Sequence, residues 1–150
     1  IRPLRWSSEE FCRDTITSFF EDADILKLTD EELFFLTETD TLEAGLAKLD
    51  ELLVPIILIT VGAEGAYAVL NGEVTHVPVE KVIPVDTTGA GDAFMAGVLR
   101  YVHFNGLPTV TEDLVKCVAF GNKLGAFAAT KAGALTALPH YEDIKHLVED

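Results

Sequence analysis

The chain has 150 residues, a formal net charge of −14 and 49% hydrophobic residues. This length and apolar fraction fit one globular domain with a real core and exclude a disordered chain. The acidic excess argues against nucleic acid as a partner, which needs clustered Lys and Arg, and no apolar run reaches the roughly 18 residues of a membrane span.

The first third of the chain predicts helices around one strand. Residues 7–10, Ser-Ser-Glu-Glu, form a capping box that opens a helix to about Phe20. Its expected buried positions are Phe11, Ile16, Phe19 and Phe20. Residues 23–28 are typical of a short buried strand, and Thr29 then caps a helix from Asp30 to about Leu36. A further helix should start near Thr41, with helical spacing of Leu42, Leu46, Leu49 and Leu53.

The rest of the chain alternates strands and helices. Residues 55–60 are a continuous apolar run, typical of a strand covered on both faces. Asn71-Gly72 between two strand-like runs predicts a hairpin with a type I′ turn. An extended segment, 79–85, precedes helices expected at about 91–104, 111–129 and 142–148. We therefore predict a three-layer α/β/α fold with a mostly parallel sheet and one β-hairpin, with ligands at the carboxyl ends of the strands.

The segment Val85–Phe94, with the sequence VDTTGAGDAF, reads as a loop that feeds the start of a helix. Gly89, Ala90 and Gly91 leave no bulky side chain over three consecutive backbone N–H groups, which favours an anion site at the positive end of the helix. Asp92 follows directly and could receive the proton of a hydroxyl that attacks a phosphoryl group there. The alternative is a Gly-rich turn in which Asp92 interacts with the helix dipole.

This segment resembles the signature D-T-x-G-A-G-D-x-F of the ribokinase-like (PfkB) carbohydrate kinases. The resemblance implies a ribokinase-like fold, ATP and Mg²⁺ as cofactors, and a small-molecule sugar as substrate. It also implies that Asp92 is the catalytic base and that Gly89, Ala90 and Gly91 form the anion hole over the migrating phosphoryl group.

Two earlier segments resemble further positions of this family. Residues 60–65 resemble its T-x-G-x-x-G turn, which implies ATP contacts at Thr60, Gly62 and Gly65; a tight turn between strands is the alternative. Residues 29–32 resemble its N-x-x-E element, with Thr29 in place of Asn, which implies that Glu32 organises Mg²⁺ through water. The same residues also form a capping box. Lys27 could point toward phosphate, toward solvent or against a helix.

Two later segments complete the resemblance. Asn122 matches a position near the adenine, and residues 130–134 match the loop that closes the nucleotide site, with Lys131 and Gly133. In members that use K⁺, this loop and the Asp that opens the glycine motif hold the ion. The resemblance thus implies Asp86 and Thr88 as monovalent-cation ligands, and an Asx turn at Asp86 is the alternative.

Nearly all of the chain resembles the C-terminal half of such a kinase, most similar to bacterial fructokinases. The start at Ile1, the single Met95, and residues 1–6, which resemble the tail of a D-x-N-x-R-x-x-L-W-like stretch, suggest that an N-terminal half and lid are absent. The expected reaction is ATP-dependent phosphorylation of a sugar primary hydroxyl, with fructose first and 2-keto-3-deoxygluconate or ribose as alternatives. A non-catalytic nucleotide-binding protein of kinase ancestry and a purely structural domain are the other interpretations.

The remaining expectations concern the cell and the assembly. Cys12 and Cys117 form neither a disulfide framework nor a metal-like spacing, which favours a reduced cytoplasmic protein. No basic region precedes an apolar stretch at the start, so no secretory signal is expected. The resemblance implies that the full-length protein can form a homodimer through its lid.

Overall fold

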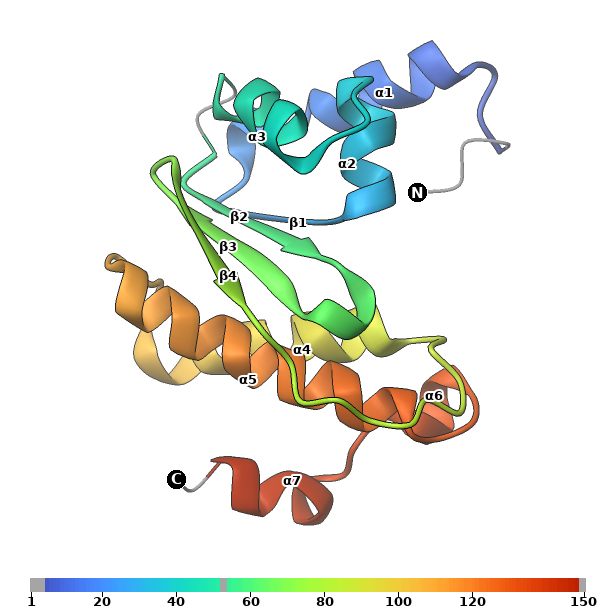
Figure 1. Cartoon of the computed structure of the whole chain (residues 1–150), viewed down its shortest axis with the longest axis vertical. Helices are drawn as coiled ribbons and strands as arrows, with labels where there is room; N and C mark the ends of the chain where they lie inside the picture. Colours follow the sequence, from blue (N-terminus) through green and yellow to red (C-terminus); the bar gives the residue numbers. More distant parts are fainter. Residues whose placement is uncertain (1–4, 52–53, 149–150) are drawn as a thin grey trace.

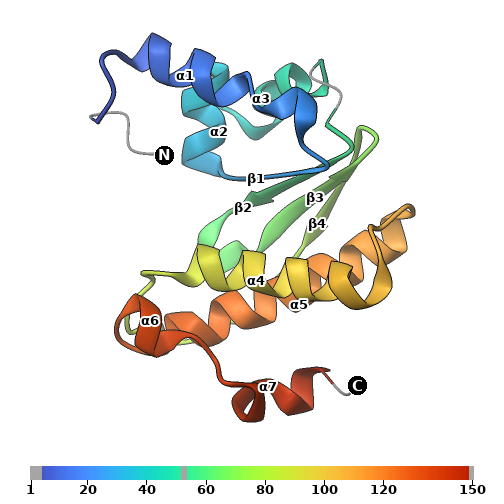
Figure 2. The same ribbon diagram turned by 180° about the vertical axis from the view of Figure 1, so that it is seen from behind.

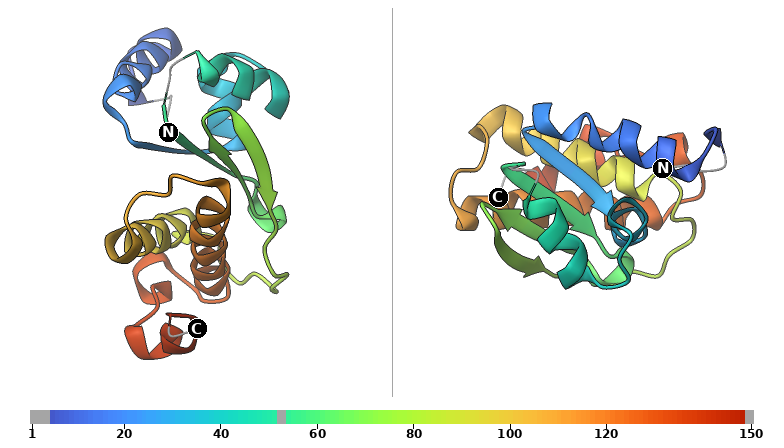
Figure 3. Two further views of the ribbon diagram at one scale, coloured as in Figure 1. Left: turned by 90° about the vertical axis from the view of Figure 1, so that its left-hand side faces the viewer. Right: turned by 90° about the horizontal axis from the view of Figure 1, so that it is seen from above.

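The computed structural model describes residues 5–51 and 54–148 and has three layers (Figure 1). A four-stranded sheet lies between α1–α3 on one face and α4 and α5 on the other, with α6 and α7 beyond them (Figures 1 and 2). Figure 3 shows the same layers from the side and from above. The predicted three-layer α/β/α class is confirmed.

The strands are β1 (Ile25–Thr29), β2 (Ile56–Thr60), β3 (Ala66–Leu70) and β4 (Glu73–Val77), in the order β1-β2-β3-β4. Among the strands of the described residues, β1 and β2 pair in parallel, whereas the other two pairs are antiparallel. The expectation of a mostly parallel sheet is therefore wrong for this chain. The reason is loop length, because a parallel connection needs a crossover of a dozen or more residues and only β1 and β2 are joined by one.

Three helices begin at a capping hydroxyl, but the capping box predicted at residues 7–10 is wrong, because α1 is capped by Ser8 and the third helical residue, Phe11, has no carboxylate to complete a box. The helical elements are α1 (Glu9–Thr17), η2 (Phe20–Asp22), α2 (Asp30–Thr37), α3 (Leu42–Asp50), η3 (Gly62–Glu64), α4 (Ala90–Asn105), α5 (Thr111–Ala129), α6 (Ala134–Ala137) and α7 (Tyr141–Val148). The side chains of Ser8, Thr29 and Thr41 accept hydrogen bonds from the amides of Phe11, Glu32 and Ala44. These hydroxyls satisfy backbone donors that have no partner within the helix. The short α6 was not predicted.

Two of the expected buried positions in the first helix are wrong. Phe11 and Phe19 are 55% and 68% exposed, whereas Phe20 is buried. Helix α1 ends at Thr17, so Phe19 leaves the spacing that would continue the apolar face of the helix. The expected position at Leu53 lies outside the described residues.

Alternation along β2 divides the core between the two faces of the sheet. Ile56 and Leu58 pack with residues of α4 and α5, whereas Ile57 and Ile59 pack with residues of α2 and α3. Leu58 and Ile59 are completely buried. The continuous apolar run therefore forms a strand covered on both faces, as predicted.

Two glycine-containing features fix local geometry. Asn71 and Gly72 both have positive φ, 50° and 82°, as the type I′ hairpin turn between β3 and β4 requires. Helices α4 and α5 approach closely where Gly97 meets Gly121: a Cβ on Gly97 would lie 2.9 Å from the Gly121 Cα atom.

No described helix has the length and apolar character that crossing a membrane needs.

Candidate active site

A pocket of about 750 Å³ opens where the carboxyl ends of β1 and β2 meet the turn at η3 and the N-terminus of α4. The predicted site residues that line it are Lys27, Thr29, Thr60, Gly62, Gly65, Ala90, Gly91 and Asn122. Those predicted around the pocket but not lining it are Glu32, Asp86, Thr88, Gly89, Asp92, Lys131 and Gly133. The structure thus brings segments that are distant in sequence to one place, at the edge where strand ends predict a ligand.

The glycine loop presents backbone donors to this pocket. Gly89 starts α4 with a φ of 83°, and a Cβ there would lie 3.2 Å from the Ala134 Cα atom, so only glycine fits without strain. The amide of Ala90 donates to the Thr87 carbonyl at 3.1 Å. No acceptor among residues 5–51 and 54–148 takes the amides of Gly91 and Asp92. These N–H groups stand at the positive end of a 16-residue helix, where an anion is stabilised.

Asp92 lies in the first turn of α4, directly after the pocket-lining Gly91. Its side chain is exposed. This placement suits both a base at the rim of the anion site and a carboxylate that interacts with the helix dipole.

The loop before α4 is anchored by Asp86. One carboxylate oxygen accepts from the Thr88 amide at 2.9 Å, and the other accepts from the Gly133 amide at 2.9 Å. Hydrogen bonds from Thr88 and from the Gly133 amide hold the pKa of Asp86 below its ordinary value. The Asx turn that the sequence offered as an alternative is therefore present, and the same carboxylate joins the two loops that the resemblance assigns to a monovalent cation.

Lys27 reaches the start of α4 from the middle of β1. Ile25 packs toward α4 and α5, whereas Leu26 and Leu28 pack into the opposite face of the sheet. Because side chains alternate along a strand, Lys27 emerges on the same face as Ile25. A Cβ on Gly91 would lie 3.3 Å from the Lys27 Nζ atom, so the ammonium lies against the glycine loop.

Thr29 and Glu32 form a complete capping box at the start of α2. The Glu32 amide donates to the Thr29 hydroxyl at 3.1 Å, and the Thr29 amide donates to Glu32 Oε2 at 2.9 Å. The neighbouring Asp30 and Glu31 line the pocket, which the sequence analysis missed. The sequence signal that could have found them is their position inside the motif 29–32, which directly follows an expected strand.

Asn122 is a buried polar residue in the wall of the pocket. Its Nδ2 donates to the Val77 carbonyl at 2.9 Å and to the Pro78 carbonyl at 3.4 Å, which ties α5 to the end of β4. The same helix also presents small residues to the pocket: Gly125, Ala126 and Ala129. These three residues were not among the predicted site residues.

Lys131 lies near the site but turns toward another partner. Its Nζ lies 3.8 Å from Asp143 Oδ2 and 4.3 Å from the centre of the Phe127 ring. This ion pair joins the loop after α5 to α7. The role of Lys131 near the nucleotide stays a prediction.

The segment 79–85, expected to be extended, forms no strand and supplies the outer wall of the pocket. Val79, Glu80, Lys81, Val82 and Pro84 line it. Within the described residues, no group of three or more His, Cys, Asp or Glu side chains could hold a metal directly. A Mg²⁺ ion here would therefore depend on water and on ligand oxygens, as is usual for this ion beside phosphates.

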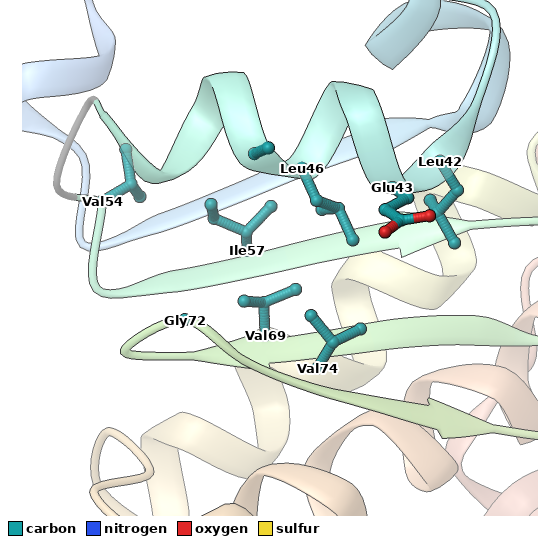
Figure 4. Close-up of a pocket in the computed structure, with 9 residues that line it drawn as sticks. Leu42, Glu43, Leu46, Val54, Ile57, Val69, Gly72 and Val74 are labelled. Atoms are coloured by element: carbon teal, nitrogen blue, oxygen red, sulfur yellow. The ribbon is translucent and has the colours of Figure 1, made fainter.

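A second pocket, of about 380 Å³, lies on the opposite face of the sheet beneath α3 (Figure 4). Its lining is mainly apolar, with Leu42 and Leu46 above Ile57, Val69 and Val74. Glu43 is its one charged lining residue within the described part of the chain. Such a lining is unsuited to a phosphate, so the larger pocket is the candidate active site.

Comparison with known proteins agrees with this geometry. The model of the pfkB family carbohydrate kinases matches residues 1–141. A fructokinase of Klebsiella pneumoniae is 39% identical over 146 residues, which cover 97% of this chain and 48% of that protein.

Two solved structures are similar as well. The crystal structure of fructokinase from Vibrio cholerae O395, with fructose, ADP and calcium bound, matches with a TM-score of 0.90 and 34% identity, over 97% of this chain and 47% of that one. The aminoimidazole riboside kinase of Salmonella enterica matches with a TM-score of 0.88 and 29% identity. The match covers 100% of this chain and 50% of that one. The chain thus spans about half the length of these relatives.

Proposed function

The chain belongs to the pfkB family of carbohydrate kinases, and from that premise we propose that it supplies the nucleotide-binding and catalytic-base part of an ATP-dependent sugar kinase. This part corresponds to the C-terminal half of such an enzyme. The observation that carries the proposal is the pocket at the start of α4, where amides of Gly91 and Asp92 without a described acceptor stand beside the Lys27 ammonium.

Asp92 acts in this proposal as the general base. A sugar hydroxyl attacks the γ-phosphorus atom of ATP, the bond to the bridging oxygen of ADP breaks, and the hydroxyl proton passes to the Asp92 carboxylate. A free alcohol is too weak an acid to ionise beforehand, so this proton moves late in the step. The amides at the start of α4 stabilise the charge on the equatorial oxygens of the phosphoryl group.

The acidic residues at the start of α2 fit a Mg²⁺ ion that is bound partly through water. Glu32 would hold it with Asp30 and Glu31, which line the pocket. Mg²⁺ supplies neutralisation of charge on the phosphates. Asp86 and the Thr88 carbonyl are the proposed ligands of a monovalent cation. A crystal structure of a similar fructokinase holds fructose, ADP and a potassium ion, which supports the use of such a cation in general.

Thr60, Gly62 and Gly65 are the proposed contacts along ATP, with Asn122 in the wall near the adenine and the loop of Lys131 and Gly133 closing the site. Fructose is the proposed acceptor, because the curated relatives similar to this chain are named fructokinases. We further propose a cytoplasmic protein that can form homodimers when it is full length.

The test uses this chain joined to an N-terminal half like that of its relatives. ATP consumption is measured with Mg²⁺ and K⁺ against fructose, ribose, 2-keto-3-deoxygluconate and aminoimidazole riboside. We expect turnover with fructose, and we expect Asp92→Asn to lower kcat by about 10²–10⁴-fold while ATP still binds.

Asp113→Asn is the matched control, because Asp113 is the third residue of α5 as Asp92 is the third residue of α4. A control with normal turnover shows that loss of a carboxylate from a first helical turn is not itself the cause. If no sugar is phosphorylated although Mg·ATP binds, the kinase proposal is wrong and a non-catalytic nucleotide-binding protein is the better interpretation.

A further inference from the structure

We propose that Lys27 is the side-chain cation of the anion hole, where its ammonium contacts the oxygens of the phosphoryl group in transfer. This inference rests on the proposed function and adds a catalytic residue to it. The phosphorus–oxygen bond to ADP breaks as the bond to the sugar oxygen forms, and the proton goes to Asp92. Lys27 takes no part in the proton transfer and acts by contact with the phosphoryl oxygens.

The geometry of β1 and α4 brings Lys27 to the glycine loop. The side chain leaves the half-buried middle of β1 on the face toward α4, and Lys27 and Gly91 both line the pocket. The absence of a side chain on Gly91 lets the ammonium approach, since a Cβ there would lie 3.3 Å from Nζ. Helix and lysine therefore converge on one point of the pocket surface.

Electrostatics explains why this arrangement needs an anion. The N-terminus of a helix carries a partial positive charge, so a cation placed against it is repelled. Among residues 5–51 and 54–148, no carboxylate lies within 4.0 Å of Nζ in an ion pair, although Lys27 does interact with the charge of Glu32. An anion between the ammonium and the amides of Gly91 and Asp92 would turn this repulsion into attraction toward a shared ligand.

The other lysines near the pocket are less suited to this role. Lys131 is paired with Asp143 and lies over the Phe127 ring. Lys81 lines the pocket from the exposed segment 79–85, where water screens its charge. Lys27 is held by a strand whose backbone is paired with β2, so its position is the most fixed of the three.

The experiment compares Lys27→Met and Lys27→Arg with Lys123→Met, a control on the exposed surface of α5. It uses the chain joined to an N-terminal half, as above. We expect Lys27→Met to lower kcat by about 10²–10³-fold, as loss of one oxyanion donor does, and Lys27→Arg to restore part of the rate. Lys123→Met should match the wild type.

A second readout separates catalysis from folding. Mg·ADP with aluminium fluoride imitates the phosphoryl group in transfer, and its affinity is compared with that of Mg·ADP alone. We expect Lys27→Met to abolish the gain that aluminium fluoride gives and to leave the affinity for Mg·ADP within about threefold, since the contact is made in the transition state. A merely structural role of Lys27 would weaken both complexes equally.

The inference is overturned if Lys27→Met keeps both the wild-type kcat and the gain from aluminium fluoride. It is also overturned if both complexes weaken equally. A wild-type protein that phosphorylates no sugar contradicts the proposed function instead, and the aluminium fluoride measurement then still decides whether Lys27 binds the anion.

Discussion

One carboxylate oxygen of Asp86 accepts a hydrogen bond from the backbone amide of Gly133, at 2.9 Å and across 47 residues of sequence. The other oxygen of the same carboxylate accepts from the Thr88 amide. Asp86 therefore fixes the loop before α4 against the loop after α5, and with it the position of the anion site at Gly91.

The pH dependence of stability should report this bond. Because the folded-state pKa of Asp86 is lowered from the ordinary value of 3.8, its stabilising contribution is present above that value and is lost as the pH falls through the folded-state pKa. We expect Asp86→Ala to have a lower Tm than the wild type from about pH 5 to 7, and the difference to shrink below about pH 4. A difference in Tm that is constant from pH 7 to 3 would show that the charge of Asp86 is not involved.

Gly97→Ala should destabilise the packing of α4 on α5. The new Cβ would lie 2.9 Å from the Cα atom of Gly121, and backbone cannot move aside as a flexible side chain can. We expect a loss of about 1–3 kcal/mol in the free energy of unfolding, measured by urea denaturation.

The sign of this effect is diagnostic. In an exposed helix, Gly→Ala stabilises by about 0.5–1 kcal/mol. Ala96→Gly, at the neighbouring exposed position, measures how much the difference in helix propensity between Ala and Gly changes the stability of the same helix. A Gly97→Ala variant as stable as the wild type, or more stable, would mean that the two helices can separate at no cost.

Asn122 should be required as a donor. Asn122→Ala leaves the buried Val77 carbonyl without its partner and should cost about 1–3 kcal/mol. In Asn122→Asp a carboxylate would face the oxygen of that carbonyl. Burial beside this acceptor disfavours the charged form and raises the folded-state pKa of the new Asp above its unfolded value of about 3.9. The Asp variant should therefore be closest to the wild type below about pH 4 and lose stability as the pH rises through the raised pKa. If the Asn122→Asp variant and the wild type are equally stable from about pH 4 to 8, the donor role of Asn122 is wrong.

Local signals in the sequence were sufficient for most of the helices and strands, although the short α6 was not predicted. Thr29 with Glu32 predicted a capping box, and Asn71-Gly72 predicted a hairpin, because both depend on residues a few positions apart. The prediction of a mostly parallel sheet was wrong, although the lengths of the connections in the sequence could have excluded it. The five residues between β2 and β3 are too few for a crossover.

Other features depend on tertiary placement and have no local signature. Phe11 and Phe19 follow an apolar pattern in sequence but are exposed, since neither is covered by the described part of the chain. The contact of Lys27 with Gly91 joins a strand to a helix 64 positions later, and the Lys131–Asp143 pair depends on how α7 folds back. The resemblance located the motifs, whereas the geometry between them came from the structure.

The capping box at Thr29 allows the local role of this residue to be tested apart from the metal. Thr29→Ala removes the hydroxyl that accepts from the Glu32 amide and should cost about 0.5–2 kcal/mol in the free energy of unfolding. Thr29→Asn restores the residue that the family motif carries and can cap equally well, so its stability should match the wild type. Chemical denaturation measures both variants, and equal losses would show that Asn cannot replace the cap here.

Glu32→Gln should separate capping from metal binding at the same place. Gln can still accept from the Thr29 amide, as it does in other capping boxes, but it lacks the charge that attracts Mg²⁺ through water. We expect the Mg²⁺ concentration for half-maximal turnover to rise about 10–100-fold, which is the usual effect of removing a partner in the outer shell of a metal. Glu112→Gln in the first turn of α5 is the control for a general loss of acidic charge. If both variants need the same Mg²⁺ concentration as the wild type, Glu32 serves only as part of the cap.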